Sequence, residues 1–275
     1  MMIGIDIGAT SCRAVVDGRP LAEASTPTPP RALGDVLRSF RPRGAAIEGV
    51  GIGFAASVGA DGRVAAWSNR PAYVGLDVDT LARSIFDAPV VWLDDCAAAA
   101  VAEHGDEATT STLYVGVGTG IGAGFVDRGR LLEGATRSAM ALGHVRVPSA
   151  GDAPCTCGAR GCVQAVASGR ALASKGVELR LPPGKIAASA AQGDPQARSL
   201  LMSIVEPLAE AVALACKLLD PTRVVLGGGL SEAGPWLTAA LGARVPVPVV
   251  GARHGRLSAA LGALAHARAH VRRNA

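Results

Sequence analysis

The stretch that most restricts the possible folds of this chain is Cys155-Thr156-Cys157-Gly158-Ala159-Arg160-Gly161-Cys162, and His144 lies upstream of it. Three thiolates and one imidazole are a preferred ligand set of a closed, four-coordinate structural zinc site. The two glycines allow the tight turns that would gather the cysteines around one ion. A disulfide is the alternative, although Cys-x-Cys is difficult to bridge and no secretion signal precedes it. We therefore predict that zinc, bound by His144, Cys155, Cys157 and Cys162, fixes a loop at the edge of a substrate site.

The composition is that of a globular protein. The chain has 275 residues, of which 49% are hydrophobic and 3% aromatic, which is enough for two lobes. We find no apolar run of the roughly 18 residues that a membrane-spanning helix needs. The first residues lead directly into a strand pattern instead of a signal peptide. We expect a cytoplasmic protein without membrane association, with Cys12, Cys96 and Cys216 as small core residues.

The net charge of +4 is modest, and part of it lies in the basic stretch 266–273. With so few aromatic residues, this stretch is typical of a solvated helix face and not of a nucleic-acid site. We expect no nucleic-acid partner. An anionic small-molecule substrate is compatible with the charge.

Isoleucine alternates with glycine or aspartate from Ile3 to Gly8, which predicts a strand, and Cys12–Val16 returns after a turn. No helix follows the glycines, so the pattern is that of a hairpin followed by a third strand and not of a dinucleotide-binding unit. A second hairpin, Leu113–Val126, has the same layout around Gly118-Thr119-Gly120. This similarity indicates a duplicated half.

Between the hairpins, the buried strand Pro89–Leu93 ends at Asp94-Asp95 and an alanine-rich helix, Cys96–His104, follows. Open α/β sheets place their chemistry at such strand ends. The remaining predicted elements are helices near 31–41, at 77–87, from Asp194-Pro195 to Leu219 with a kink at Pro207, and at 257–272, and strands at Gly49–Ala55, Arg63–Trp67 and Thr222–Leu226.

Three glycine clusters are candidates for phosphate or nucleotide binding: Gly8-Ala9-Thr10, Gly118-Thr119-Gly120 and Gly227-Gly228-Gly229. The first two combine backbone N–H groups with a hydroxyl, a pattern suited to phosphate. A tight turn without a ligand is the alternative for any one of them. Asp6, which precedes the first turn, is a candidate to hold Mg²⁺ through water.

Asp95 is the candidate general base. Transfer of a phosphoryl group to an alcohol requires a carboxylate that accepts the hydroxyl proton as the oxygen attacks. The alternative for Asp94 and Asp95 is a pair of helix N-cap residues. Adjacent side chains point in different directions, so one carboxylate can cap the helix while the other faces a substrate.

These motifs resemble the ROK family (repressors, open reading frames and sugar kinases) of the actin/hexokinase/Hsp70-like ATPase superfamily. The resemblance covers essentially the whole chain in order and spacing, and its zinc run is the most specific part. The stretches that carry it are Asp6–Thr10, Leu93–Asp95 before the alanine-rich helix, Gly118–Gly124, Gly143-His144, Cys155–Cys162 and Leu226–Ser231.

The resemblance implies a two-lobed, ribonuclease-H-like α/β fold, with mixed sheets, flanking helices and ATP in a cleft between the lobes. It implies a sugar-side lobe at residues 1–108 and a nucleotide-side lobe at 109–258 with the zinc loop at 144–162. The helix 259–275 would pack back on the first lobe. This chain begins at the first strand, so we expect no DNA-binding domain of the kind found in the family's repressors.

The resemblance also implies roles for individual residues. It assigns Gly8, Ala9, Thr10, Gly118, Thr119 and Gly120 to the ATP phosphates, and Gly227, Gly228 and Gly229 to the adenosine. It makes Asp95 the base for a sugar hydroxyl, usually that at C6. Its sugar-binding positions are Asn69, Asp94, Asp95, His144 and Gln164, and the cofactors it implies are Mg²⁺ and structural Zn²⁺.

The chain departs from the family pattern at the sugar site. The family's usual Glu-x-Gly-His reads Ala141-Leu142-Gly143-His144, and a common glutamate after the last zinc cysteine is Gln164. Ala9 and Ala97 replace a usual glycine and asparagine. The resemblance assigns both glutamates to hydroxyls near C1 to C3, and an unpaired buried group costs about 1–3 kcal/mol.

We therefore expect an ATP-dependent hexose or amino-hexose kinase whose sugar is kanosamine or an N-acyl amino sugar and not plain glucose. The alternatives are a glucokinase, and a catalytically weak sugar- or nucleotide-binding sensor. A homodimer is the expected assembly.

Overall fold

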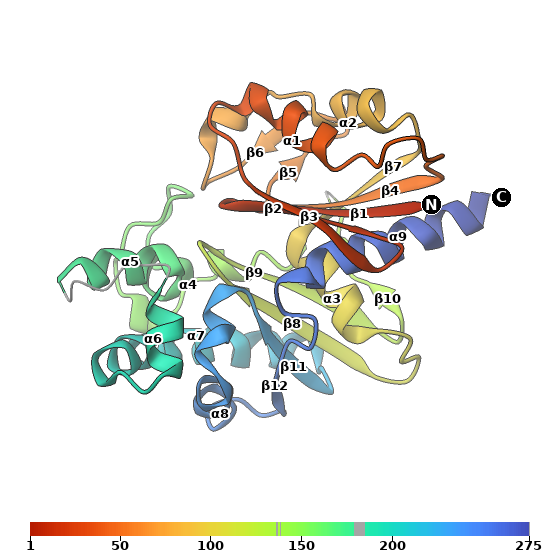
Figure 1. Ribbon diagram of the computed structural model, residues 1–275. Helices are drawn as coiled ribbons and strands as arrows, with labels where there is room; N and C mark the ends of the chain where they lie inside the picture. Colours follow the sequence, from red (N-terminus) through yellow and green to blue (C-terminus); the bar gives the residue numbers. More distant parts are fainter. Residues whose placement is uncertain (136, 138, 179–184, 275) are drawn as a thin grey trace. The chain divides into compact units, whose positions relative to one another are not determined.

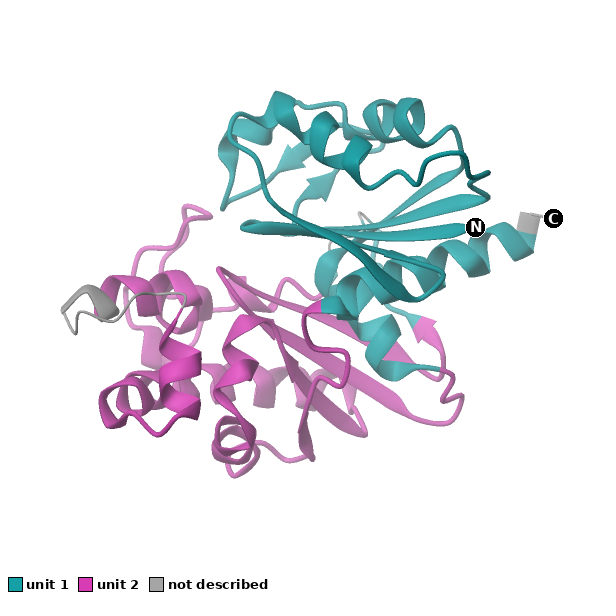
Figure 2. Cartoon of the chain, viewed as in Figure 1, with its two compact units in different colours: residues 1–105, 131–139, 257–275 teal, residues 106–130, 140–256 magenta. Residues whose placement is uncertain are grey.

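Two five-stranded sheets with the same internal order form the framework of the protein (Figure 1). This computed structural model describes residues 1–135, 137, 139–178 and 185–274. The chain divides into two compact units (Figure 2): unit 1 comprises Met1–Gly105, Leu131–Ala139 and Leu257–Ala275, and unit 2 comprises Asp106–Arg130 and Met140–Arg256. The fold class that the sequence predicts, mixed sheets with flanking helices, is confirmed.

The sheet of unit 1 has the order β3-β2-β1-β4-β7. Its strands are β1 (Met2–Ile7), β2 (Ser11–Val16), β3 (Arg19–Ser25), β4 (Gly49–Phe54) and β7 (Val90–Asp94). The β1–β2 and β2–β3 pairs are antiparallel, whereas β4 is parallel to both β1 and β7. The carboxyl ends of β1, β4 and β7 therefore lie at one edge of the sheet, where ligands bind in open α/β sheets.

The alternation of isoleucine and glycine in β1 has a packing reason. Ile3, Ile5 and Ile7 are fully buried in one core cluster, and burial of each such side chain contributes about 1.5–3 kcal/mol. The opposite face packs against α9 (Ser258–Asn274). A Cβ atom on Gly4 would lie 2.1 Å from the Ala260 carbonyl oxygen. Glycine therefore allows close approach of α9, and Asp6 lies on this same glycine face.

The remaining elements of unit 1 surround this sheet. They are α1 (Leu33–Ser39), α2 (Val78–Phe86), α3 (Asp95–His104), the short strands β5 (Ser57–Val58) and β6 (Val64–Ala66), and the 3₁₀ turns η1 (Pro30–Ala32) and η2 (Pro71–Tyr73). The helix predicted near 31–41 is thus divided into a 3₁₀ turn and an α-helix. The α9 helix contacts α3, β1 and β4, and residue 275 of its predicted span lies outside the described residues.

The sheet of unit 2 has the order β10-β9-β8-β11-β12. Its strands are β8 (Ser111–Val117), β9 (Ile121–Asp127), β10 (Arg130–Leu131), β11 (Arg223–Gly227) and β12 (Val249–Gly251). The β8–β9 pair is antiparallel, and β11 is parallel to β8 and β12. The β8–β9 hairpin therefore occupies the place that β1–β2 occupies in the first sheet, as the similar glycine turns predict.

The helices of unit 2 include several that the sequence did not predict. Its helical elements are α4 (Val163–Ala167), α5 (Gly169–Glu178), α6 (Ile186–Ala191), α7 (Pro195–Leu219), α8 (Pro235–Gly242), and the 3₁₀ turns η3 (Leu142–His144), η4 (Pro148–Ala150), η6 (Gly229–Ala233) and η7 (Gly255–Leu257). The last turn, η7, runs from unit 2 into unit 1.

The predicted start of α7 is confirmed, because the Asp194 side chain accepts a hydrogen bond from the Ala197 N–H at 2.8 Å and Pro195 follows it. Pro207 lies inside the helix, and its kink stays a prediction. In the described ranges α7 alone has the length and apolarity to cross a membrane, but 61% of its most apolar window is buried, so it is a core helix.

Candidate functional site

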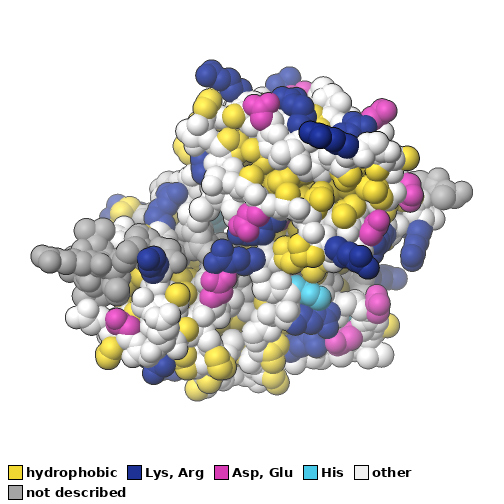
Figure 3. Space-filling view, in the orientation of Figure 1, with side chains coloured by type: hydrophobic (Ala, Val, Ile, Leu, Met, Phe, Trp, Pro, Cys, Tyr) yellow, Lys and Arg dark blue, Asp and Glu magenta, His cyan; other side chains and the backbone are white. Residues whose placement is uncertain are grey.

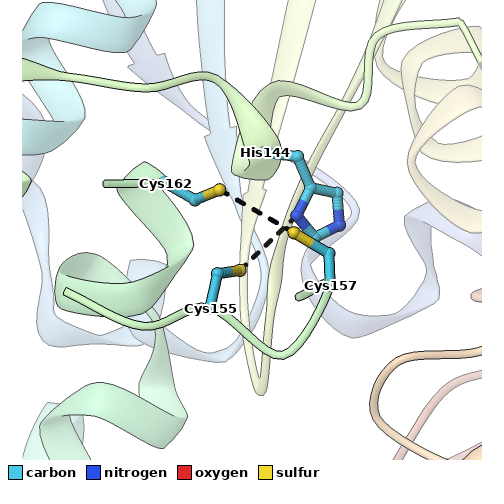
Figure 4. A group of neighbouring side chains, drawn as sticks. All are labelled: His144, Cys155, Cys157 and Cys162. Atoms are coloured by element: carbon cyan, nitrogen blue, oxygen red, sulfur yellow. Dashed lines mark hydrogen bonds between the residues drawn. The ribbon is translucent and has the colours of Figure 1, made fainter. Parts of the chain in front are cut away.

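Three cysteines and a histidine meet at one point in unit 2 (Figure 4). The Sγ atoms of Cys157 and Cys162 are 3.8 Å apart, and Cys155 Sγ is 3.7 Å from His144 Nδ1. A tetrahedral zinc ion with Zn–S bonds of about 2.3 Å would separate two sulfurs by about 3.8 Å. The four side chains thus fit a closed structural zinc site.

The loop that carries this cluster is shaped by its own backbone. The Cys155 N–H donates to the Ala159 carbonyl at 2.9 Å, and the Gly158 N–H donates back to the Cys155 carbonyl at 3.0 Å. Gly158 and Gly161 both have positive φ, at 89° and 78°, which glycine adopts readily. Cys162 occupies the N-cap position of α4, so one ligand is fixed by a helix.

The disulfide alternative is wrong for this structure. All six cysteines are free, and a sulfur separation of 3.8 Å is far longer than the roughly 2.05 Å of a disulfide bond. The thiols differ in acidity: the Ala159 N–H lowers the pKa of Cys157, whereas burial raises the pKa of Cys162 to about 12. A zinc ion deprotonates coordinating thiols outright.

In unit 1, two adjacent carboxylates lie at the end of β7. Asp94 is the N-cap of α3, and its Oδ1 atom accepts hydrogen bonds from the N–H groups of Cys96 at 2.9 Å and Ala97 at 3.1 Å. Asp95 Oδ1 accepts from Cys96 N–H at 2.8 Å. Both side chains are half-buried. Asp94 thus has the capping role that the sequence allowed for one of the pair.

Asp6 lies at the same edge of the sheet. It is only 7% exposed. Burial raises its pKa to about 8, and the charge of Asp95 adds to this shift. The Arg13 guanidinium, 3.6 Å away, acts in the opposite direction. Burial also raises the pKa of Asp95. Burial and the charge of Asp95 together raise the pKa of Asp94 to about 8. Asp6 and Asp95 are therefore close enough for their charges to interact, and Asp94 lies next to Asp95.

Both hairpin turns are closed by the N–H of their first glycine, although the two closures differ in length. The Gly8 N–H donates to the Ser11 carbonyl at 3.0 Å, and the Gly118 N–H donates to the Gly120 carbonyl at 2.9 Å. The first glycine of each turn therefore uses its donor within the hairpin and does not point it outward. Any phosphate bound at these turns would have to be held by the residues that follow: Ala9 and Thr10 in the first turn, and Thr119 and Gly120 in the second.

The third glycine cluster follows β11 and is fixed by close contact. Gly228 has φ of 79°, and a Cβ atom there would lie 2.6 Å from the Val117 carbonyl oxygen. A Cβ atom on Gly227 would meet the Tyr114 hydroxyl at 2.2 Å. Gly229 begins η6 and would meet nothing within 4 Å. Side chains are therefore excluded from the first two positions only.

The predicted sugar-binding residues are distributed over both units. Asn69, Asp94 and Asp95 belong to unit 1, whereas His144 and Gln164 belong to unit 2. Asn69 is half-buried in the turn that the Arg70 N–H closes onto the Trp67 carbonyl at 3.0 Å.

Gln164 is only 8% exposed, and both ends of its amide are used within unit 2. Its Oε1 atom accepts from the Ile121 N–H at 2.9 Å, and Nε2 donates to Thr156 Oγ1 at 3.3 Å. The side chain thus ties the start of β9 to the zinc loop.

Two arginines near these groups were missed at the level of sequence. Arg13 faces Asp6 directly across the β1–β2 hairpin, a pairing that the hairpin register could have revealed. Arg70 donates from Nε to the Ala9 carbonyl at 2.8 Å. The sequence pattern around Arg70 did not predict this contact, because the contact joins segments far apart in the chain.

Comparison with known proteins identifies the family of this chain. The model of the ROK family matches residues 2–269 of the chain. The chain belongs to the ROK family. A kanosamine kinase of Amycolatopsis mediterranei (strain S699) is 36% identical over 245 residues, which cover 84% of this chain and 80% of that protein. An N-acetylmannosamine kinase of Escherichia coli O139:H28 (strain E24377A / ETEC) is 34% identical over 250 residues, or 84% of each protein.

Solved ROK structures agree with the fold. A ROK family glucokinase from Streptomyces griseus, in complex with glucose and AMPPNP, superposes with a TM-score of 0.85 at 26% identity and covers 98% of this chain and 99% of its own. This ROK protein is an ATP-dependent sugar kinase.

Lys and Arg side chains are interspersed with Asp and Glu on the face shown in Figure 3, with no continuous basic stripe there.

Proposed function

We propose that this kinase transfers the γ-phosphoryl group of ATP to the 6-hydroxyl of an amino-hexose, with Asp95 as the general base. The observation that carries the proposal is that the two adjacent carboxylates at the β7–α3 junction have different roles in the fold. Asp94 Oδ1 accepts from two N–H groups of the first turn of α3 and caps the helix, whereas Asp95 accepts from the Cys96 N–H and is also hydrogen-bonded to the Cys96 side chain. Because Asp94 is the cap, Asp95 is the carboxylate that we assign to the substrate proton.

The electrostatics support this role. Burial raises the pKa of Asp95, and a base with a higher pKa takes a hydroxyl proton more readily near neutral pH. Asp95 would accept the proton of the 6-hydroxyl as its oxygen attacks the γ-phosphorus. ADP would leave with the bridging oxygen.

The remaining candidate residues would position the nucleotide and metals. The residues Ala9, Thr10, Thr119 and Gly120 would contact the phosphates, and Gly227, Gly228 and Gly229 the adenosine. Asp6 would hold Mg²⁺ through water, and Mg²⁺ would offset the charge on the phosphate oxygens. His144, Cys155, Cys157 and Cys162 would hold a zinc ion with a structural role only.

The choice of an amino sugar follows from charge. Asp6, Asp94 and Asp95 share one edge of the sheet, and burial disfavours the ionised form of each. A substrate ammonium beside Asp94 would favour ionised carboxylates, whereas a neutral sugar would not. Two relatives at about 35% identity are named kanosamine kinase and N-acetylmannosamine kinase. The free amine makes kanosamine the better candidate.

Two residues of the predicted sugar site support the same choice. Ala141 offers no carboxylate, and the Gln164 amide is already hydrogen-bonded at both ends. A glucose hydroxyl that depends on a glutamate at either position would lose a partner, at about 1–3 kcal/mol for a group left unpaired.

The test is a comparison of kcat/KM for kanosamine, N-acetylmannosamine and glucose, with identification of the phosphorylated carbon by NMR. We expect kanosamine to exceed glucose by at least about tenfold, and the product to be the 6-phosphate. Glucose as the best substrate would make the protein a glucokinase and defeat the amino-sugar proposal. Tight sugar binding without ATP consumption across the panel would favour a sensor.

For its assembly and location we keep the predictions of a homodimer in the cytoplasm. Light scattering of the purified protein tests the first, and a mass of one chain at micromolar concentration would exclude it.

A further inference from the structure

One guanidinium group links two segments of unit 1, the first glycine turn and residues 26–28. Arg70 Nε donates to the Ala9 carbonyl at 2.8 Å, and Nη1 donates to Thr28 Oγ1 at 2.6 Å. Nη1 and Nη2 also donate to the carbonyls of Pro27 and Thr26, at 3.5 and 3.3 Å. A planar, five-donor fork is suited to such a set of acceptors.

Three of the four acceptors of Arg70 belong to residues 26–28, the segment that supports the first glycine turn. Thr26 Oγ1 donates to the Gly8 carbonyl at 2.6 Å, and the Thr26 N–H donates to the Thr10 carbonyl at 3.0 Å. The turn is therefore held by Arg70 directly at Ala9 and indirectly through Thr26.

The backbone of Arg70 is itself fixed next to Asn69. The turn that contains both rests on Trp67, which is 3% exposed and packs edge-on between Phe54 and Tyr73, with ring centroids 4.9 and 4.8 Å away. The Tyr73 N–H donates to the Arg70 carbonyl at 3.0 Å. A shift of Asn69 would therefore move the base of the Arg70 side chain.

We propose that Arg70 is a positioning residue that couples the sugar side of unit 1, at Asn69, to the phosphate turn at Gly8–Thr10. It would act through the backbone of the turn and not by contact with either substrate. When a sugar orders Asn69, Arg70 orders the Ala9 carbonyl and with it the turn, so that less conformational freedom remains to be lost when ATP binds. The inference rests on the proposed use of Asn69 and Gly8–Thr10 by sugar and ATP.

The experiment measures the affinity for a non-hydrolysable ATP analogue with and without saturating kanosamine, in the wild type and in Arg70→Ala. Couplings between sites are typically 5–150-fold. We expect the sugar to tighten analogue binding in the wild type, and Arg70→Ala to lower this ratio at least about fivefold with a small change in Tm. Arg70→Lys keeps the charge but not the fork, so it should not restore the ratio.

Two control variants distinguish coupling between the two sites from general stabilisation of unit 1. Arg63→Ala removes another arginine of unit 1, which donates to the Gly75 carbonyl at 2.9 Å, away from the turn. Tyr73→Phe removes the bond from the Tyr73 hydroxyl to the Pro27 carbonyl at 2.8 Å but leaves Arg70 in place. Both should keep the wild-type ratio.

An unchanged ratio in Arg70→Ala, an equal loss in Arg63→Ala, full recovery in Arg70→Lys, or a wild type without any coupling would each overturn the inference. These outcomes are separate from those for the proposed function. Phosphorylation without coupling leaves the kinase proposal intact, whereas coupling without phosphorylation leaves the Arg70 role intact.

Discussion

Asp94 and Asp95 both accept a hydrogen bond from one donor, the backbone N–H of Cys96, at 2.9 and 2.8 Å. Two half-buried carboxylates that share a donor cannot both be fully satisfied by it, and their charges oppose each other. Burial raises the pKa of both side chains. The pair therefore titrates as a unit, and its ionisation should control the reaction.

The first prediction concerns the pH dependence of catalysis. A general base must be ionised, so kcat/KM should fall as the pH drops through the raised pKa of the pair, well above the usual range of a carboxyl group. Asp94→Asn removes one negative charge and should move this acid limb to lower pH. Steady-state rates between pH 5 and pH 9 provide the check, and a wild-type kcat/KM that stays constant down to pH 5 would contradict it.

Asp6 should make the free energy of unfolding depend on pH. Burial raises its pKa from 3.8 to about 8 in the folded chain. The folded state therefore holds this proton while the unfolded state loses it, so the stability present below about pH 4 is lost as the pH rises to about 8. Urea unfolding without Mg²⁺ should show this loss in the wild type and less of it in Asp6→Asn. Identical pH slopes in the two proteins would reject the buried neutral form of Asp6.

Removal of zinc should lower the stability of the fold and should not affect phosphate binding directly. Elemental analysis should find about one zinc per chain, and zinc at a thousandfold its Kd would stabilise the fold by about 4 kcal/mol. Cys157→Ser should lose the metal and lower Tm. Cys216→Ala, at a buried cysteine outside the cluster, should keep it. Zinc retained in Cys157→Ser at full occupancy would speak against the four-ligand site.

The glycine cluster after β11 offers a matched pair. Gly228→Ala places a Cβ atom 2.6 Å from the Val117 carbonyl oxygen at a φ of 79°, whereas Gly229→Ala meets nothing within 4 Å. Strain of this kind costs about 1–3 kcal/mol. We expect Gly228→Ala to lower Tm and weaken ATP binding, and Gly229→Ala to keep the wild-type Tm. Equal Tm values for the two variants would show that the backbone relaxes.

Local signals in the sequence were sufficient for much of the fold. The Ile3–Gly8 alternation predicted β1, because one face of that strand packs in the core and the other against α9. Asp194 followed by Pro195 predicted the start of α7, because a cap is formed by residues adjacent in the chain. The candidate zinc ligands could be predicted because three of them lie within one short run, and the structure brings all four together.

Contacts between distant segments were not accessible in this way. The engagement of Gln164 by Ile121 and Thr156, and of Arg70 by Ala9, depends on how separate elements pack. The helix predicted near 31–41 was too long because Pro30 starts a 3₁₀ turn before α1 begins. Side-chain partners of this kind follow from the tertiary structure alone.

The most direct measurement is the rate of a single turnover with ATP and kanosamine in Asp95→Asn, beside Asp94→Asn. A general base contributes about 10²–10⁴-fold, so Asp95→Asn should lose at least about a hundredfold in rate while its affinities for the ATP analogue and sugar stay near those of the wild type. Asp94→Asn should keep the helix cap, because asparagine is also a good N-cap residue, and should weaken sugar binding more than the rate. A single-turnover rate in Asp95→Asn within a few fold of the wild type would contradict the proposed mechanism.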